Sequence, residues 1–244
     1  THDLRTPLTA ILGYAAALSD GVVPEEDVPR SLAAIEGEAT RLESLVADLL
    51  DLARLDAHRF SLDLADVSPS EVLERAFDAM APEAVSRGLT FERGIEDLPV
   101  VVTDESRVQR IVGNLLENAI HWTPAAGTLR LEARPRPGGG FTAEVTDTGP
   151  GIPRAEQERI FEAFQSLEAP DGRRGSGLGL AISRQLARAL GGDVWVESSE
   201  GSGSRFVLEV RGPLSAAPTA AGGTGPSGAA GGAGAAGAVR PSGR

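Results

Sequence analysis

The first residues of the sequence carry side chains suited to nucleophilic chemistry. His2 is one of three histidines in the chain, and Asp3 follows it directly. A carboxylate beside an imidazole can fix its tautomer and accept its proton, which leaves the ring able to attack phosphorus. A single exposed histidine on a helix more often has no such role, so this pair does not decide the function alone.

Two asparagines form a second candidate site. Asn114 and Asn118 are four residues apart, so on a helix they share one face. Asparagine is a poor helix former, and its amide oxygen is a hard ligand of the kind that Mg²⁺ prefers. The pair therefore indicates a polar or metal-binding role, although solvated or capping asparagines would give the same pattern.

Two glycine-rich segments could approach a phosphate-bearing ligand. Residues 147–152 read DTGPGI after an expected strand, and residues 175–180 read GSGLGL at the start of an expected helix. Glycine permits close backbone approach, and a helix N-terminus offers free N–H groups to anions. The second segment does not join a strand to a helix, so it is not a Rossmann fingerprint. A turn followed by a helix cap remains an alternative for each segment.

Composition excludes several classes of function. The 244 residues carry a net charge of −12, which argues against nonspecific binding to nucleic acid or to an anionic membrane surface. There is no cysteine, so disulfides, zinc–thiolate sites and cysteine nucleophiles are excluded. All 23 basic residues are arginine, which excludes lysine chemistry. The chain begins at Thr1 without methionine, and we expect it to be part of a longer protein.

Two helices must present the histidine. We expect one from about Asp3 to Ser19 and another from about Glu25 to Asp56. The second has apolar residues at alternating steps of four and three, a heptad pattern that favours a helical hairpin dimerising into a four-helix bundle. A single antiparallel pair packed on the rest of the chain is the alternative. The heptad positions are Val28, Leu32, Ile35, Ala39, Leu42, Val46, Leu49 and Ala53.

The remaining sequence predicts a mixed α/β domain, which gives an α+β chain overall. We assign residues 1–60 to the helical domain, 61–69 to a linker, 70–211 to the α/β domain and 212–244 to a disordered Gly/Ala/Pro-rich tail. Expected helices span 70–79, 104–121 and 178–190. Expected strands span 90–93, 100–103, 128–134, 141–146, 194–198 and 204–210.

Together these segments resemble the motifs of sensor histidine kinases, in that family's order along residues 2–210. HDLRTPL at residues 2–8 resembles the phosphoacceptor box, and NLLENAIHWTP at 114–124 resembles the N box. DTGPGI resembles the G1 box, FEAF at 161–164 the F box, GSGLGLAIS at 175–183 the G2 box, and GSGSRF at 201–206 the final strand signature.

The resemblance implies a protein-histidine kinase with a Bergerat-type ATP-binding domain. His2 is then the phosphorylated residue, Asp3 orients its ring and takes its proton, and Thr6 places a water during dephosphorylation of the partner. Asn118 is the expected Mg²⁺ ligand, and Asp147 accepts from the adenine amino group. Further expected ATP-binding residues are Asn114, His121, Gly149, Gly151, Ile152, Phe161, Phe164, Arg173, Arg174, Gly175, Gly177, Leu178, Gly179 and Ser204.

Some positions depart from the family's pattern. His121 stands where a basic residue commonly faces the phosphates, so we expect Arg173 and Arg174 to take more of that role. Ser204 replaces a frequent threonine, and Gln165-Ser166 replaces an aromatic–basic pair. The expected cofactors are ATP and Mg²⁺. The expected partners are a second copy of the chain and the receiver domain of a response regulator, with no nucleic acid.

Two other functions remain as alternatives. One is a dimeric scaffold that binds nucleotide without transferring phosphate. The other is an ATPase of the same nucleotide fold, such as a chaperone or mismatch-repair type, which would use glutamate at the Asn114 position. By analogy with the family, we expect this part of the protein to be cytoplasmic and the full-length protein to be anchored in the plasma membrane through other regions.

Overall fold

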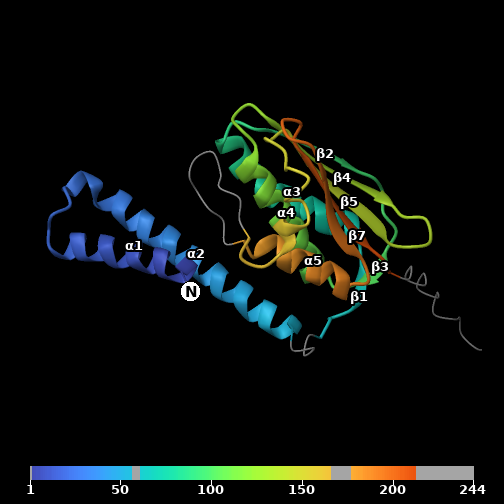
Figure 1. Ribbon diagram of the computed structural model, residues 1–244, viewed down its shortest axis with the longest axis horizontal. Coiled ribbons are helices and arrows are strands. Elements are labelled where there is room, and N and C mark those ends of the chain that lie inside the picture. The colour runs from blue at the N-terminus through green and yellow to red at the C-terminus, as the bar shows by residue number, and fades with distance from the viewer. Residues whose placement is uncertain (1, 57–60, 166–176, 213–244) are drawn as a thin grey trace, which may run out of the picture.

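The structure, a computed structural model, describes residues 2–56, 61–165 and 177–212. A helical hairpin comes first in the chain, and a layered α/β domain follows it (Figure 1). Among these residues, no helix is both long enough and apolar enough to cross a bilayer. The expected disordered tail lies almost wholly outside the described residues, so its state stays a prediction.

The hairpin consists of α1 (His2–Ser19) and α2 (Val28–Asp56), which pack antiparallel (Figure 1). Gly21 turns the chain with a φ of +66°, a conformation that costs glycine little, and the short 3₁₀ helix η1 (Glu25–Asp27) leads into α2. The two predicted helices are confirmed, with η1 occupying the expected start of the second.

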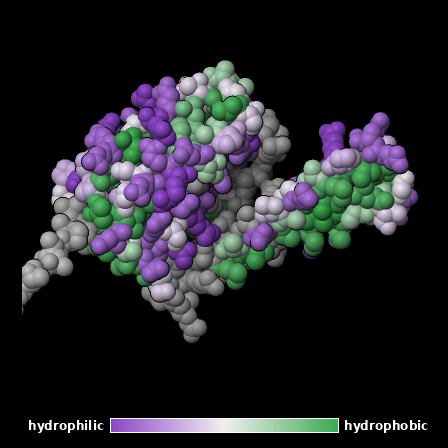
Figure 2. Space-filling model, turned by 180° about the vertical axis from the view of Figure 1, so that it is seen from behind, coloured by the Kyte–Doolittle hydropathy of each residue, from purple (hydrophilic) through white to green (hydrophobic). Residues whose placement is uncertain are grey.

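Much of the predicted heptad seam is exposed in this single chain. Leu32, Val46 and Leu49 of α2 are 49%, 44% and 41% exposed, and Leu12 of α1 is 61% exposed. Figure 2 shows the same feature as a hydrophobic surface along the hairpin. Only Leu45 is deeply buried among the apolar residues described on α2, where the helix passes beside α5. The hairpin alone therefore does not cover its own apolar residues.

The α/β domain is a two-layer sandwich (Figure 1). Helices α3 (Pro69–Ser86), α4 (Glu105–Trp122) and α5 (Gly179–Ala189) cover one face of a five-stranded sheet. The strand order is β2-β4-β5-β7-β6, with β2 parallel to β4 and the other neighbours antiparallel. These strands are β2 (Thr90–Ile95), β4 (Thr128–Pro135), β5 (Phe141–Asp147), β6 (Asp193–Ser198) and β7 (Ser204–Val210).

Alternation along the strands decides which face meets the helices. Every second residue of β5 is buried, from Phe141 to Asp147, and the pleat turns the residues between them to the other face. Phe206 and Leu208 of β7 are likewise almost fully buried. The helices supply the matching apolar stripes, and α4 alone buries seven apolar residues. The predicted mixed sheet is thus confirmed.

Two local expectations differ from the structure. The segment expected to be linker contains strand β1 (Ala65–Val67), which pairs antiparallel with β3 (Val101–Thr103) in a separate small sheet. Three residues are too few to show a strand periodicity in the sequence. Helix α3 runs to Ser86 rather than ending near Ala79. It continues through Pro82 because its next turn buries Ala84 in the core.

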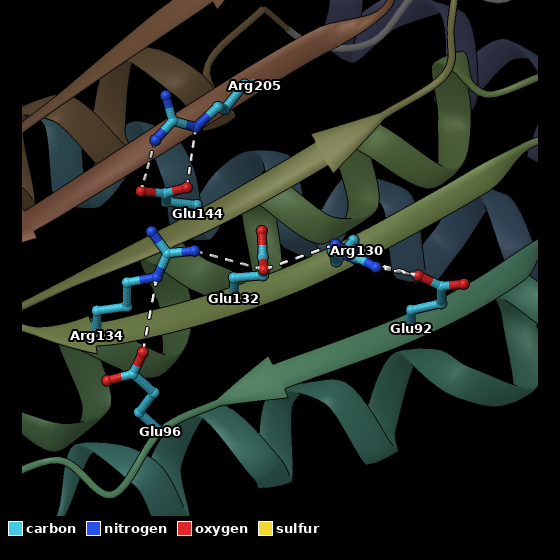
Figure 3. Close-up of polar contacts among 7 residues, drawn as sticks. All are labelled: Glu92, Glu96, Arg130, Glu132, Arg134, Glu144 and Arg205. Carbon is cyan, nitrogen blue, oxygen red and sulfur yellow. Dashed lines mark hydrogen bonds and ion pairs between the residues drawn. The ribbon is translucent and has the colours of Figure 1, made fainter.

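The other face of the sheet is charged and open to solvent. Arg130 donates to Glu92 at 2.9 and 3.0 Å and lies 3.7 Å from Glu132, which Arg134 also approaches at 3.7 Å. Arg134 reaches Glu96 at 3.7 Å. Figure 3 shows these five residues with the pair formed by Arg205 and Glu144. Because most of these side chains are exposed, each pair contributes about 0.2–1 kcal/mol, so we assign this face to solubility rather than to stability.

Asp104 fixes the start of the helix that carries the two asparagines. It is the N-cap of α4 and is 3% exposed. Its Oδ1 accepts from the Arg107 backbone N–H at 3.2 Å and from Ser106 Oγ at 2.7 Å, and its Oδ2 accepts from the Asp63 N–H at 3.0 Å. Burial alone would raise the pKa of Asp104, but these hydrogen bonds outweigh it and hold the pKa below the ordinary 3.8.

Asp104→Ala should lower the free energy of unfolding by about 2 kcal/mol at pH 7, because the cap and the Asp63 amide both lose their acceptor. A lowered folded-state pKa stabilises above the ordinary carboxyl pKa, so the difference from wild type should shrink as pH falls below about 4. Urea unfolding at several pH values measures this. The neighbour Glu105→Ala is the control: it removes only an exposed ion pair with Arg75 and should lower the free energy of unfolding by about 1 kcal/mol or less. An equal effect of both variants would contradict the capping role.

Candidate functional site

Helix α4 presents the two asparagines at the edge of its buried face. Leu115 and Ala119 beside them are in the core, whereas Asn114 and Asn118 are half-buried. The apolar stripe thereby fixes the rotation of the helix and leaves the two amides on its border. This is the shared face that the spacing predicted.

Asn114 ties α4 to the start of α5. Its Nδ2 donates to the Gly179 carbonyl oxygen and to Ser183 Oγ, both at 3.2 Å. A Cβ on Gly179 would lie 3.7 Å from the Asn114 Cγ, which is ordinary contact, so the helix N-terminus packs directly on this amide. With both donor bonds made to α5, the amide oxygen is the part of Asn114 suited to a cation or its waters.

Asp147 ends β5 as a buried carboxylate. It is 4% exposed, and its Oδ1 accepts from the N–H groups of Gly149 at 2.8 Å and Ser204 at 3.3 Å. Burial raises the pKa of Asp147, and the two backbone N–H groups only partly oppose this rise. Both bonds end on Oδ1, which leaves Oδ2 to accept from a ligand. Ser204, predicted from the last motif, thus contributes through its backbone.

Two glycines make this close packing possible. A Cβ on Gly149 would lie 2.7 Å from Asp147 Oδ1 and 2.9 Å from the Trp122 carbonyl oxygen. Gly203 has a φ of +77°, and a Cβ there would overlap the Asp147 carbonyl oxygen. The end of α4, the G1 segment and the β6–β7 hairpin therefore meet around one carboxylate.

Gln157 connects the last residue of the G1 segment to the end of β6 through hydrogen bonds. Its Nε2 donates to the carbonyl oxygens of Ile152 at 3.0 Å and Ser198 at 2.9 Å, and the Ile152 N–H donates to Ser198 Oγ at 2.8 Å. Gly151 has a φ of +74°, and a Cβ there would overlap the Ser199 carbonyl oxygen. Sequence reasoning did not single out Gln157 or Ser198, because their contacts join segments 41 residues apart.

The F box contacts strand β7 through a side chain and the G2 box through its backbone. Phe161 ends the 3₁₀ helix η2 (Arg159–Phe161), and its ring packs edge-on against Phe206 with centroids 6.5 Å apart. Phe164 is 55% exposed and has a φ of +65°, and its N–H donates to the Gly177 carbonyl oxygen at 3.0 Å. Phe164 thus reaches the G2 box through its backbone.

The other predicted residues occupy different positions. Leu178 is buried as the N-cap of α5, and the half-buried His121 ring lies edge-on to Trp122 at the end of α4. Thr6 is exposed on α1, while His2 and Asp3 form its first turn and their side chains lie outside the description. Arg173, Arg174 and Gly175 lie outside the described residues, so their expected roles stay predictions.

A hollow of about 790 Å³ opens beside the same hairpin, but it is not where these groups converge. Ile152, Gln157, Ser198 and Ser204 line it, without Asp147 or either asparagine. Within the described part of the chain, no three His, Asp or Glu residues gather as a metal site. The amide oxygens of Asn114 and Asn118 on α4 are hard ligands of the kind that Mg²⁺ takes together with phosphate oxygens.

Comparison with known proteins agrees with this geometry. Residues 1–58 match the family His Kinase A (phospho-acceptor) domain, and residues 103–214 match the family Histidine kinase-, DNA gyrase B-, and HSP90-like ATPase. A solved mycobacterial sensor histidine kinase, MprB, is 30% identical with a TM-score of 0.52, and the alignment covers 62% of this chain and 99% of that one. This chain belongs to the sensor histidine kinases.

Longer relatives align with both parts of this histidine kinase. The adaptive-response sensory kinase SasA of Synechococcus sp. (strain JA-3-3Ab) is 35% identical over 209 residues, covering 84% of this chain and 55% of SasA. Full-length ShkA, solved in complex with AMPPNP, is 36% identical with a TM-score of 0.70, covering 89% of this chain and 45% of ShkA. The kinase chain thus spans about half the length of these relatives.

Asp147→Asn should separate binding from folding in this histidine kinase. The asparagine keeps an oxygen for Gly149 and Ser204 but places N–H groups where the adenine amino group would donate, so nucleotide affinity should fall about tenfold or more. Because burial raises the pKa of Asp147, its charge costs stability at pH 7, and the variant should be as stable as wild type or up to roughly 1 kcal/mol more stable. Calorimetric titration with ADP and urea unfolding test both; joint loss of stability and affinity would contradict this role.

The two asparagines should behave differently. Asn114→Ala should lower the free energy of unfolding by about 1–2 kcal/mol, because it removes both hydrogen bonds to α5. Asn118→Ala, on the same helix face, should change it by about 0.5 kcal/mol or less and should abolish the effect of Mg²⁺ on ATP affinity. Urea unfolding and ATP titrations with and without Mg²⁺ provide the measurements. If Asn118→Ala leaves the Mg²⁺ dependence intact, its assignment as metal ligand fails.

Proposed function

We propose that this chain catalyses ATP-dependent phosphorylation of its own His2 and passes the phosphoryl group to an aspartate of a response-regulator receiver domain. The observation that carries the proposal is the buried Asp147 carboxylate beside the end of α4, the same helix whose Asn114 binds the start of α5, in a chain whose first helix begins at His2. The complex of ShkA with AMPPNP supports nucleotide binding in this fold.

The binding step rests on the geometry around Asp147 and the start of α5. Asp147 Oδ2 accepts from the adenine amino group, and Gly149, which has no Cβ, lets the backbone pack against Oδ1 and fix the carboxylate. The N-terminus of α5, held by Asn114, offers backbone N–H groups to the phosphates. Asn118 would hold Mg²⁺ through its amide oxygen, with Asn114 beside it. Magnesium, when bound, offsets the negative charge of the transferring phosphoryl group.

The transfer step uses the first turn of α1. Asp3 takes the proton of one ring nitrogen of His2, and the other nitrogen attacks the γ-phosphorus. The bond from phosphorus to the bridging oxygen breaks, and ADP leaves. The aspartate of the receiver then takes the phosphoryl group from His2. Thr6, exposed one turn after His2, would orient a water that hydrolyses the phosphoaspartate of the receiver.

We also propose that the working unit is a homodimer. Apolar side chains of both hairpin helices remain largely exposed in the single chain, Leu8, Leu12, Leu32, Val46, Leu49 and Leu50 among them. A second hairpin would bury them in a four-helix bundle. A membrane anchor outside this chain stays a prediction from the resemblance.

Incubation with Mg²⁺ and γ-labelled ATP tests the proposed reaction. Label should appear on the chain, resist alkali and be lost in acid, as expected for a phosphorus–nitrogen bond. His2→Gln should remove it and His58→Gln, another of the three histidines, should keep it. ATP binding, followed by the fluorescence of Trp122 at the end of α4, should persist in both variants.

The same experiment separates the alternatives. Normal ATP binding without label in the wild-type chain would overturn the kinase proposal in favour of a nucleotide-binding scaffold. Release of phosphate from ATP that continues unchanged in His2→Gln would indicate an ATPase instead. Label that survives acid, or that remains in His2→Gln, would rule out His2 as the acceptor.

A further inference from the structure

Arg184 is one of two arginines of α5 that the proposed reaction leaves without a role. It lies in the second turn of the helix, and its side chain is 17% exposed. Its Nη1 donates to Glu158 at 2.9 Å and its Nε donates to Asp193 at 3.2 Å. The same guanidinium lies over the ring of Phe161, 4.8 Å from its centroid. One side chain thus joins α5, the start of β6 and the turn that contains the F box.

Phe161 is held between this cation and the sheet. Its other neighbour is Phe206, which is 1% exposed and fixed in the core of β7. A guanidinium can stack on an aromatic face and still donate in its own plane to carboxylates, which an ammonium group cannot do. The two acidic partners therefore hold the guanidinium of Arg184 over the ring.

A closed series of contacts, in which Arg184 takes part, surrounds the N-terminus of α5. Three residues after Phe161, the Phe164 N–H donates to the Gly177 carbonyl oxygen, and a Cβ on Gly177 would lie 2.5 Å from the Gln165 carbonyl oxygen. The chain then enters α5 at Gly179, whose carbonyl is bound by Asn114. Arg184, on the same helix, completes this series of contacts because its guanidinium lies over Phe161.

We propose that Arg184 is a positioning residue that, by clamping Phe161, fixes the N-terminus of α5 for the phosphates of ATP. The inference rests on the proposed function, because that function assigns the phosphates to this helix end. Arg184 itself touches neither substrate nor metal in this proposal. It acts through Phe161 and Gly177, so its loss should affect the phosphate end of the ligand and spare the adenine end at Asp147.

Calorimetric titrations with AMPPNP and with adenosine test the proposal. Arg184→Met, which keeps the length and loses the charge, should weaken AMPPNP binding about tenfold and leave adenosine binding within about twofold. Arg184→Lys should recover only part of the loss, because lysine cannot stack and make both ion pairs. Arg188→Ala is the matched control: Arg188 also donates to Asp193 at 3.2 Å, but it is 57% exposed, and its variant should bind both ligands as wild type does.

A double-mutant cycle with Phe161→Leu tests the route of the effect. If Arg184 acts through the ring, Arg184→Met in the Phe161→Leu background should add less than about twofold to the loss of AMPPNP affinity. Independent, multiplying losses would overturn the proposal, as would equal losses for adenosine and AMPPNP, which a general loss of folding would cause. These affinities need no phosphoryl transfer, so a failure of labelling at His2 would count against the proposed function and not against this clamp.

Discussion

The buried carboxylate of Asp147 is the constraint around which the ATP-binding domain is arranged. A charge that is 4% exposed must be solvated by the protein, and the N–H groups of Gly149 and Ser204 supply that solvation through one oxygen. These bonds need the G1 turn and the β6–β7 hairpin to approach the end of β5 so closely that Gly203 has no room for a Cβ. Glycines in two separate motifs thus serve one carboxylate, which is why the motifs occur together.

Sequence reasoning succeeded where a pattern repeats over many residues. Helix α4 was predictable because its apolar residues recur at helical spacing and Asp104 stands at its start, and the alternation of β5 and β7 gave both strands. Strand β1 was not predicted because its three residues are too few to show an alternating pattern. The hydrogen bonds from Asn114 to Gly179 and from Gln157 to Ser198 were not predicted, because they join residues that are 65 and 41 positions apart. Such contacts depend on how the helices pack on the sheet, which no local pattern encodes.

Asn114 links the packing of α5 to the proposed binding of the ligand. Its amide donates to the Gly179 carbonyl oxygen and to Ser183 Oγ in the first turns of α5. In the proposed reaction the same residue would hold the helix whose N–H groups bind phosphate and would lie beside the cation. Asn118, one turn later, makes no such bond among the described residues, so the two asparagines differ in what they do for the fold.

Because the chain has no lysine, arginine side chains alone balance its excess of acidic residues. With 35 acidic and 23 basic residues, an arginine that bridges two carboxylates neutralises more repulsion than one that binds a single partner. On the open face of the sheet, Arg130 does this with Glu92 and Glu132 (Figure 3). Arg205 does it with Glu144, also drawn in Figure 3, and with Glu197. Arg184 also binds two carboxylates, but its side chain is more buried and in addition lies over the ring of Phe161. Beside Phe161 one guanidinium lies over an aromatic ring and also binds two carboxylates, a combination that suits arginine better than lysine.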